Sequence, residues 1–151
     1  MNEAIKDILF ITLTMLLVYI YAAYPVLLFF MAKLFPRRHN PDDSYEPSVT
    51  LIISAHNEED VIGVKLLNAI DLDYPSDKLS IMVVSDGSTD RTDDIVRTFG
   101  DRGVLLVRPT ERRGKTAGIN FAIAGVTSDV VVFSDANAMY DRFAIRRLVR
   151  H

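Results

Sequence analysis

The hydrophobic positions of this chain form one long uninterrupted run, followed by a series of short runs separated by polar segments. Residues 8–32 hold no charged side chain, and at about 1.5 Å per residue they can cross a hydrocarbon core of about 30 Å. A helix of this length in a soluble protein would carry a polar stripe, and this run has none. Pro25 lies within it and is expected to kink the helix without preventing a membrane span. The pattern predicts a transmembrane anchor over residues 1–35.

A cleaved signal peptide is the alternative interpretation of this segment. Such a peptide starts with a basic region and has an apolar core of about 7–15 residues. Here Glu3 and Asp7 make the start acidic and the run is longer, so an uncleaved, single-pass anchor is favoured. One basic residue precedes the run, and Lys33, Arg37 and Arg38 follow it. The positive-inside rule therefore predicts a cell-membrane protein whose C-terminal domain is cytoplasmic.

The rest of the chain alternates between two kinds of hydrophobic pattern. Residues 36–47 are polar and contain three prolines, which is typical of a linker. Four short, mainly apolar runs follow, and the apolarity of the first, residues 48–54, is typical of a strand covered on both faces. The predicted strands are residues 48–54, 79–85, 104–107 and 129–134.

Apolar residues that recur three and four positions apart predict helices between these strands. The first helix is expected to start within residues 57–60, where Asn57 precedes three acids. Ser88 or Thr89 is expected to cap the second helix and Gly100 to end it. Residues 115–124 form the third, and Asp141 caps the last. The predicted inner faces comprise Ile62, Leu66, Ala69, Ile70, Thr92, Ile95, Val96, Phe99, Ala144, Ile145, Leu148 and Val149.

Alternating strands and helices indicate an α/β fold with a parallel sheet and right-handed crossovers. Ligands of such sheets bind beyond the carboxyl ends of the strands. Polar clusters follow three of the predicted strands, at residues 54–58, 85–90 and 134–137. All three are therefore expected at one edge of the sheet.

Two acids in these clusters, Asp86 and Asp135, are better explained as ligand-binding residues than as helix caps. Asp90 and Asp141 are interpreted as helix caps, a common use of Asp after a strand or turn. Asp86 and Asp135 directly follow apolar strands, where two carboxylates repel each other unless a cation or donor lies between them. A divalent ion with a diphosphate meets this need, because Mg²⁺ and Mn²⁺ prefer carboxylate and phosphate oxygens.

Composition and charge exclude several kinds of protein. The formal net charge is −3, which does not favour nucleic acid as a partner. The chain has no cysteine, so it has neither a disulfide framework nor a Cys-ligated zinc site. A basic cluster at residues 112–116 includes Gly114 and Lys115, but Pro109 stands where a P-loop needs glycine. Lysine beside the amides of a helix N-terminus still favours anion binding.

The ordered motifs resemble those of family-2 glycosyltransferases over the whole of residues 47–151. The resemblance implies a Rossmann-like GT-A fold, in the form of a nucleotide-binding half-domain over residues 48–151. It also implies inverting transfer from a nucleotide-activated sugar. The leading anchor resembles that of cellulose- or hyaluronan-synthase-like members. The motifs are residues 47–59, 83–90, Gly114-Lys115 with Asn120, and 133–137.

The resemblance assigns a role to each matching residue. The nucleotide-sugar-binding residues would be His56, Glu58, Asp86, Lys115 and Asn120, and the metal ligands for Mg²⁺ or Mn²⁺ would be Asp135 and Asn137.

The chain departs from the family pattern at three positions. His56 stands where the family more often has Tyr, Ser85 replaces the first acid of Asp-Asp-Gly, and Asn137 replaces the second acid of Asp-x-Asp. The contact made by the first acid of Asp-Asp-Gly is therefore in question. The Asp-Ala-Asn form resembles a known subset of the family.

The general base of an inverting transferase is missing from the predicted site. The family places an Asp or Glu well after the metal motif, whereas Asp141 is the sole acid after Asn137, and the chain has no Trp. We therefore expect an N-terminal fragment or truncated reading frame that binds nucleotide weakly and transfers no sugar alone. The implied partners are a nucleotide-sugar donor, by resemblance a UDP-sugar, a saccharide or lipid-linked acceptor, and the lipid bilayer.

Two other classes of protein share some of these sequence features. A non-catalytic, membrane-anchored nucleotide-binding module would share the same motifs up to residue 137. A phosphoacceptor receiver domain also carries Asp at strand ends, but it needs an acid pair directly after its first strand. Here Glu58 and Glu59 lie further on, at a predicted helix start, so a receiver domain is disfavoured.

Overall fold

The computed structural model describes residues 2–35, 42, 44–109 and 114–150. It divides into two units, residues 1–40 and 41–151. Most of the predicted linker, residues 36–41 and 43, lies outside the described residues, as do Arg112 and Arg113 of the basic cluster.

The first unit is a single helix formed by the long apolar run. It comprises α1 (Glu3–Val18), a π-helical turn η1 (Tyr19–Ala23) and α2 (Tyr24–Leu34). Together these span 32 residues and are long and apolar enough to cross a membrane. None of their described side chains is buried, which matches the absence of a polar stripe in the sequence.

The π-helical turn lies immediately before Pro25. In a regular α-helix the proline ring would clash with the carbonyl of Tyr21, four residues earlier, and one N–H would be missing from the ladder. Here the N–H of Tyr24 donates to the carbonyl oxygen of Tyr19, five residues back, as in a π-helix. The widened turn accommodates the proline within one continuous helix, a local change that sequence analysis did not predict.

The second unit is built on a four-stranded parallel sheet with the order β3-β2-β1-β4. The strands are β1 (Val49–Ala55), β2 (Leu79–Ser85), β3 (Val104–Val107) and β4 (Val130–Asp135). The predicted parallel α/β fold is confirmed, and the strand bounds agree with the predicted ones to within one residue. The sequence succeeds here because both faces of the central strands are buried, so apolarity is continuous along them.

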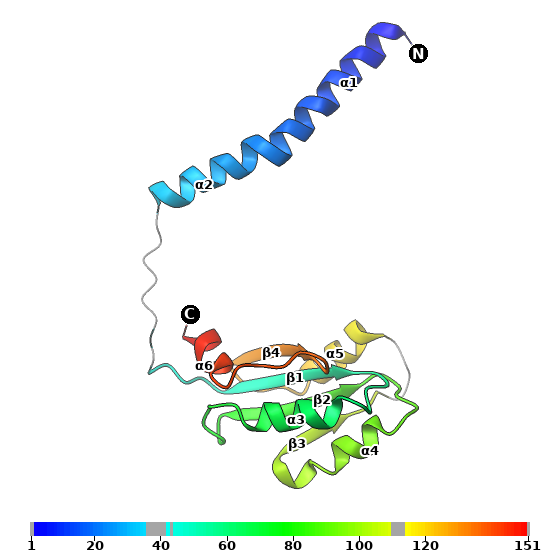
Figure 1. The fold of residues 1–151 in the computed structure, drawn as a ribbon, viewed down its shortest axis with the longest axis vertical. Helices are drawn as coiled ribbons and strands as arrows, with labels where there is room; N and C mark the ends of the chain where they lie inside the picture. The colour runs from blue at the N-terminus through cyan, green and yellow to red at the C-terminus, as the bar shows by residue number, and fades with distance from the viewer. Residues whose placement is uncertain (1, 36–41, 43, 110–113, 151) are drawn as a thin grey trace. The chain divides into compact units, whose positions relative to one another are not determined.

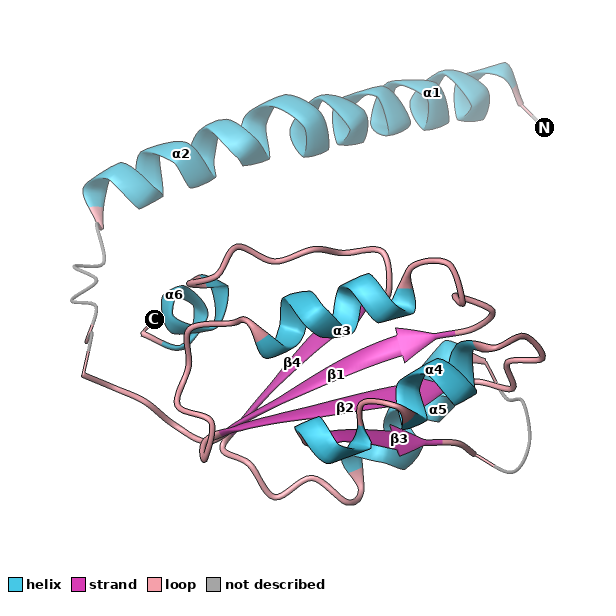
Figure 2. Ribbon diagram, turned by 60° about the horizontal axis from the view of Figure 1, so that its bottom comes forward, coloured by secondary structure: helices cyan, strands magenta, loops and turns pink. Residues whose placement is uncertain are grey.

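Helices cover both faces of the sheet, as Figures 1 and 2 show. One face carries α3 (Ile62–Ile70), α4 (Thr92–Arg97) and α6 (Ala144–Val149), and its core includes Leu51 and Val83. The other face carries α5 (Lys115–Ile123) over Ile52 and Val84. Alternate residues of each strand thus enter two separate cores, as the pleat of a strand requires.

Gly118 brings α5 close to the sheet. A Cβ atom built at this position would lie 3.1 Å from Cγ1 of Val84 on β2, a contact tighter than ordinary van der Waals packing. The missing side chain therefore sets how closely α5 approaches the strands. At the N-terminus of α5, Lys115 forms an ion pair with Asp135 at the carboxyl end of β4.

Two predicted helix boundaries are wrong. The first helix begins at Ile62 and not within residues 57–60, because Asn57 adopts a left-handed conformation with φ 54° and turns the chain away. The second helix does not end at Gly100, which starts a 3₁₀ turn, η2 (Gly100–Arg102). The left-handed residue that ends this segment is Gly103, with φ 81°.

Other helix predictions are met in part. Ser88 and Thr89 do not cap α4, because their side chains contact the loop after β1 instead. Asp90 and Asp141 each accept the N–H two residues ahead, at 3.0 Å in both cases, so they form turns leading into α4 and α6. Leu148, expected on an inner face, is exposed, since α6 buries only one narrow stripe.

Candidate functional site

A cavity of about 470 Å³ opens at the carboxyl edge of the sheet. Six of the seven residues assigned to donor or metal binding line it, as the strand-end rule leads one to expect. Asn120 is exposed on α5 and is not among its lining residues. The lining consists of Ser54, Ala55, His56, Glu58, Asp86, Gly114, Lys115, Asp135 and Asn137.

The register of the sheet places the two strand-end acids on opposite sides of β1. Asp135 pairs with Ser54, and Asp86 follows Ser85, which pairs with Ala55. The ladder continues just past the strand ends, where the N–H of Asp86 donates to the carbonyl of Ala55 at 3.1 Å. Two strand spacings separate the backbones that carry the acids, about 10 Å. The two carboxylates therefore share one cavity but reach it from either side of the central strand.

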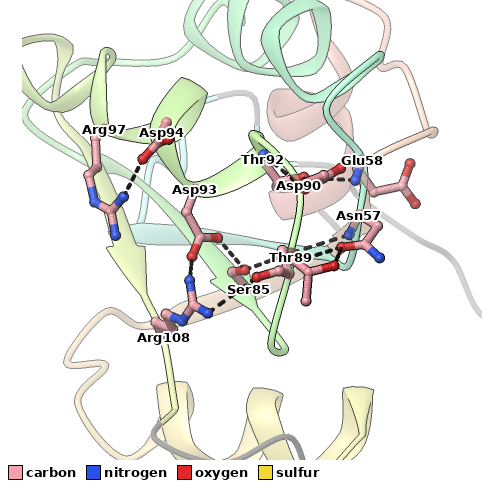
Figure 3. Close-up of polar contacts among 11 residues, drawn as sticks. Asn57, Glu58, Ser85, Thr89, Asp90, Thr92, Asp93, Asp94, Arg97 and Arg108 are labelled. Atoms are coloured by element: carbon pink, nitrogen blue, oxygen red, sulfur yellow. Dashed lines mark hydrogen bonds and ion pairs between the residues drawn. The ribbon is translucent and has the colours of Figure 1, made fainter.

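Hydrogen bonds fix the loop after β1 to the loop after β2 (Figure 3). The side chain of Asn57 accepts the N–H of Thr89 at 2.8 Å. The N–H of Glu58 donates to the hydroxyl of Thr92 at 2.8 Å. The N–H of Glu59 donates to Asp90 at 3.1 Å. Partners some 31 to 34 residues apart in sequence thus hold His56 and Glu58 at the edge of the cavity.

Burial and hydrogen bonding act in opposite directions on Asp90. Its burial raises the pKa of the carboxyl, but hydrogen bonds from Thr92 and from the N–H of Glu59 outweigh this and leave the pKa below its ordinary value. Asp90 is therefore ionised at neutral pH and serves as a structural acceptor between the two loops.

Ser85, which replaces an acid of the family pattern, does not line the cavity. It is completely buried and hydrogen-bonds Asp93 at 2.5 Å and the hydroxyl of Ser88 at 2.9 Å. Asp93 in turn forms an ion pair with Arg108, whose guanidinium also donates to the carbonyl of Ser88 at 3.2 Å. The buried carboxylate of this region thus comes from α4 and fixes the loop that presents Asp86.

Asp135 and Asn137 each contact another residue of the cavity. Asp135 forms an ion pair with Lys115, and both side chains are more than half exposed, at 60% and 57%. The amide nitrogen of Asn137 lies 3.3 Å from each carboxylate oxygen of Glu58. These contacts join the loop after β1, the loop after β4 and the start of α5 around one space.

His56 contributes a buried ring nitrogen to the site. Its Nδ1 is buried and makes no hydrogen bond within the part of the chain that the structure describes. Buried polar atoms are normally satisfied, so a ligand or water is the expected partner of this nitrogen.

Lys65 is a residue near the site that sequence reasoning missed. It lies on α3 with Ile62, Leu66 and Ala69, all four of them completely buried. Burial lowers the pKa of the Lys65 ammonium, and the negative charge of Asp135 opposes this. The signal in the sequence was a lysine at the i+3 position of an otherwise apolar helix face.

A second cavity, of about 270 Å³, is lined by aromatic and arginine side chains near α6. Arg146, one of these, already binds Glu46 at 2.6 Å and Asp73 at 2.9 Å. Hydrogen bonds with these two acids raise the pKa of its guanidinium. Its charge is thus neutralised within the protein, and we do not assign this cavity to the donor.

The profile of the family described as Glycosyl transferase family 2 matches residues 50–151. A probable glycosyltransferase of Bacillus subtilis, YdaM, is 38% identical over 108 residues, which are 68% of this chain and 26% of that protein. The beta-monoglucosyldiacylglycerol synthase of Synechocystis is 34% identical over 68% of this chain and 22% of its own length. The chain thus spans about a quarter of the length of these relatives.

A solved structure extends the comparison to three dimensions. The mannosyltransferase PcManGT from Pyrobaculum calidifontis, in complex with GDP-Man and Mn²⁺, superposes with a TM-score of 0.75 at 35% identity. The match covers 90% of this chain and 42% of the mannosyltransferase. The expected GT-A fold is confirmed by this likeness.

Proposed function

The chain belongs to glycosyl transferase family 2, and from that premise we propose that it binds the nucleotide-sugar donor of a sugar transfer reaction. The observation that carries the proposal is a cavity at the carboxyl edge of the sheet that is lined by six of the assigned residues. Its volume of about 470 Å³ lies within the usual range for small-molecule sites, about 300–1,000 Å³.

Asp135 and Asn137 are proposed to hold Mg²⁺ or Mn²⁺. Among the described residues no group of three or more His, Asp or Glu side chains could hold a metal alone. One carboxylate and one amide fit a hard ion that keeps water and phosphate oxygens as further ligands. When bound, such an ion would neutralise charge on the departing diphosphate. Mn²⁺ in the related mannosyltransferase supports this assignment.

Lys115 is proposed to change partners when the donor binds. Its ammonium now neutralises Asp135, and both groups are exposed enough to separate at little cost. Released from Asp135, it would bind a phosphate oxygen beside the N-terminal amides of α5. The N-terminus of a nine-residue helix, preceded by Gly114 at the cavity, favours an anion.

His56, Glu58 and Asp86 are proposed to bind the nucleoside end of the donor. Asp86 lies across β1 from Asp135, about 10 Å away by strand spacing, so an elongated ligand is needed to reach both. A nucleoside diphosphate has this shape, with its base and ribose at one end and its phosphates at the other. The Nδ1 of His56, for which the described residues supply no hydrogen-bond partner, offers a hydrogen-bonding atom on the nucleoside side.

We propose a UDP-sugar donor, a saccharide or lipid-linked acceptor, and transfer with inversion. Direct displacement needs a base for the acceptor hydroxyl. Asp141 is unsuited, because it accepts the N–H of Phe143 and lies 3.3 Å from Arg147. We therefore do not propose Asp141 as that base, and we propose donor binding as the role of the cavity residues. The apolar helix is proposed as a single-pass anchor that holds the domain at the cytoplasmic face of the membrane.

Calorimetric titration of the full chain in lipid nanodiscs with UDP and GDP tests this proposal. Each nucleotide would be added with Mn²⁺, with Mg²⁺ and with a chelator. We expect saturable binding that weakens when the ion is removed and prefers UDP. A preference for GDP would reassign the donor class, and absence of binding to either would overturn the proposal. Binding without sugar transfer, even in a longer chain, would support a non-catalytic nucleotide-binding module.

A further inference from the structure

Two side chains of α3 hold the segment that follows β4. Lys65 is completely buried, and its Nζ donates to the carbonyl of Ala138. The same ammonium lies 4.0 Å from the centroid of the Tyr140 ring. Asn68 uses both ends of its amide, donating to the carbonyl of Tyr140 at 2.9 Å and accepting its N–H at 2.8 Å.

These contacts surround the proposed metal ligands without using them. Asn137 immediately precedes Ala138, whose N–H donates to the carbonyl of Asp135, three residues back, at 3.1 Å. The hydroxyl of Tyr140 returns to the carbonyl of Phe133 at 3.0 Å. The segment from 135 to 140 is thus fastened to α3 at Ala138 and Tyr140, while its ligand side chains face the cavity.

The burial of the Lys65 charge must be offset by partners at this position. Lysine is almost never fully buried unless its charge has partners, and the other buried members of this helix face are apolar. An apolar residue would pack there without desolvating a charge. The carbonyl of Ala138, the Tyr140 ring and the nearby charge of Asp135 are the partners that stabilise the ammonium.

Asp135 therefore interacts with two lysines that differ in their freedom to move. Lys115 is exposed and paired with the carboxylate itself, so it can exchange that partner. Lys65 is enclosed and already bonded to the backbone of the same segment. Its contacts with the carbonyl of Ala138 and with the Tyr140 ring do not involve the cavity side chains of Asp135 and Asn137.

We propose that Lys65 and Asn68 are positioning residues, which orient Asp135 and Asn137 for the divalent ion and the diphosphate. This inference rests on the donor-binding function proposed above. Groups that orient metal ligands from behind commonly change metal affinity by about 10- to 100-fold when they are removed.

The test compares Lys65→Met and Asn68→Leu with Leu66→Ala in the full chain in nanodiscs. Met and Leu keep the approximate volume and remove the polar contacts. Leu66 is equally buried on the same helix and serves as a control for simple loss of packing. Thermal unfolding of the wild type and of each variant identifies a temperature at which all four proteins are folded, and binding and exchange are compared at that temperature.

The first readout needs no metal or nucleotide. Hydrogen exchange of residues 136–140 should accelerate in Lys65→Met and Asn68→Leu, and should remain at the wild-type rate in Leu66→Ala. The second readout is the Mn²⁺ concentration that half-saturates UDP or GDP binding. It should rise about tenfold in the two positioning variants, while nucleotide affinity without metal stays the same.

The two possible failures are distinguishable. If the wild-type chain binds no nucleotide with Mn²⁺, the proposed function fails, and hydrogen exchange still reports on the fastening of the segment. If the wild type binds but both polar variants behave like Leu66→Ala in exchange and in Mn²⁺ dependence, the positioning role is overturned.

Discussion

The two ends of the sheet both carry carboxylates, but they hold them in different ways. At the amino end, Asp129 precedes β4 and accepts the N–H of Ser48 at 3.0 Å and its hydroxyl at 2.6 Å. Glu46 lies between Arg146 and Lys78, and its hydrogen bond with Arg146 lowers the pKa of the Glu46 carboxyl. These acids are satisfied by neighbouring strands and helices.

At the carboxyl end, Asp135 has an exposed lysine as its ion-pair partner, in the wall of a cavity. Glu58 and Asn137 contact each other across the same space. The difference shows that an acid beside a strand is structural where fixed donors surround it. We propose that such an acid is available to a ligand where its counter-ion is exposed and can exchange partners.

Asp135→Ala, at the carboxyl end of the sheet, should have the largest effect on nucleotide binding. We expect nucleotide affinity in the presence of Mn²⁺ to fall about 10- to 100-fold, since contacts to charged groups are worth about 1.5–3 kcal/mol. Calorimetric titration of the wild type and the variant measures the loss. Asp129→Ala is the matched control at the opposite end and should leave the affinity unchanged. Equal losses of nucleotide affinity in the two variants would contradict the proposed difference between the two ends of the sheet.

Lys115→Met should separate the two roles proposed for this lysine. Without its counter-ion Asp135 should bind Mn²⁺ about two- to fivefold more tightly in the absence of nucleotide, as expected for an exposed ion pair. Nucleotide affinity should move in the opposite direction by a similar factor, because a phosphate contact is lost. Paramagnetic relaxation of water by free Mn²⁺ gives the first value and calorimetry the second. Changes of the same sign would argue against an exchange of partners.

Asp129→Asn should alter stability and leave binding unaffected. The hydroxyl and N–H of Ser48 hold the pKa of Asp129 below its ordinary value. The carboxylate therefore contributes stability above the unfolded-state pKa of about 4, and loses it as the pH falls through the lower folded-state value. The variant should have a lower Tm than the wild type at pH 7, and the difference should close below about pH 4. Ser48→Ala, which removes the hydroxyl donor, should give the same convergence in thermal unfolding scans. A difference that persists in strong acid would assign the effect to something other than this carboxylate.

Asn120→Ala should have the smallest effect. The residue is exposed on α5 and is not among the lining residues of the cavity. Surface substitutions usually change free energies by no more than about 0.5 kcal/mol, so nucleotide affinity should stay within about twofold. A tenfold loss in the same titration would extend the donor site along α5, as the family resemblance implies.

The sheet could be predicted from sequence because its central strands, β1 and β2, are buried on both faces and are therefore mainly apolar. Residues 104–107 are wholly apolar, residues 79–85 are apolar except for Ser80 and Ser85, and both strands form with those bounds. The edge at which ligands gather follows from parallel topology, so the convergence of Asp86 and Asp135 on one cavity was foreseeable. That they lie on opposite sides of β1 depends on strand order, which the sequence pattern leaves open.

The failures concern side chains whose partners are distant in sequence. Asn is a residue type that commonly caps helices, but the side-chain oxygen of Asn57 accepts the N–H of Thr89, 32 residues away. Lysine usually lies on the surface, but the ammonium of Lys65 donates to the carbonyl of Ala138, 73 residues away. Local propensity cannot weigh such contacts, because they exist only after the sheet has brought the loops together.

The widened turn at Tyr19–Ala23 has a consequence for any helix that would pack along this one, if it crosses a membrane as proposed. One additional residue in a turn rotates everything after it by about 100°. The side-chain rows of α1 and α2 are therefore out of phase with each other. A straight companion helix would meet one row up to Val18 and a different row from Tyr24 onward. Two short contact surfaces, with different orientations, replace a single long one.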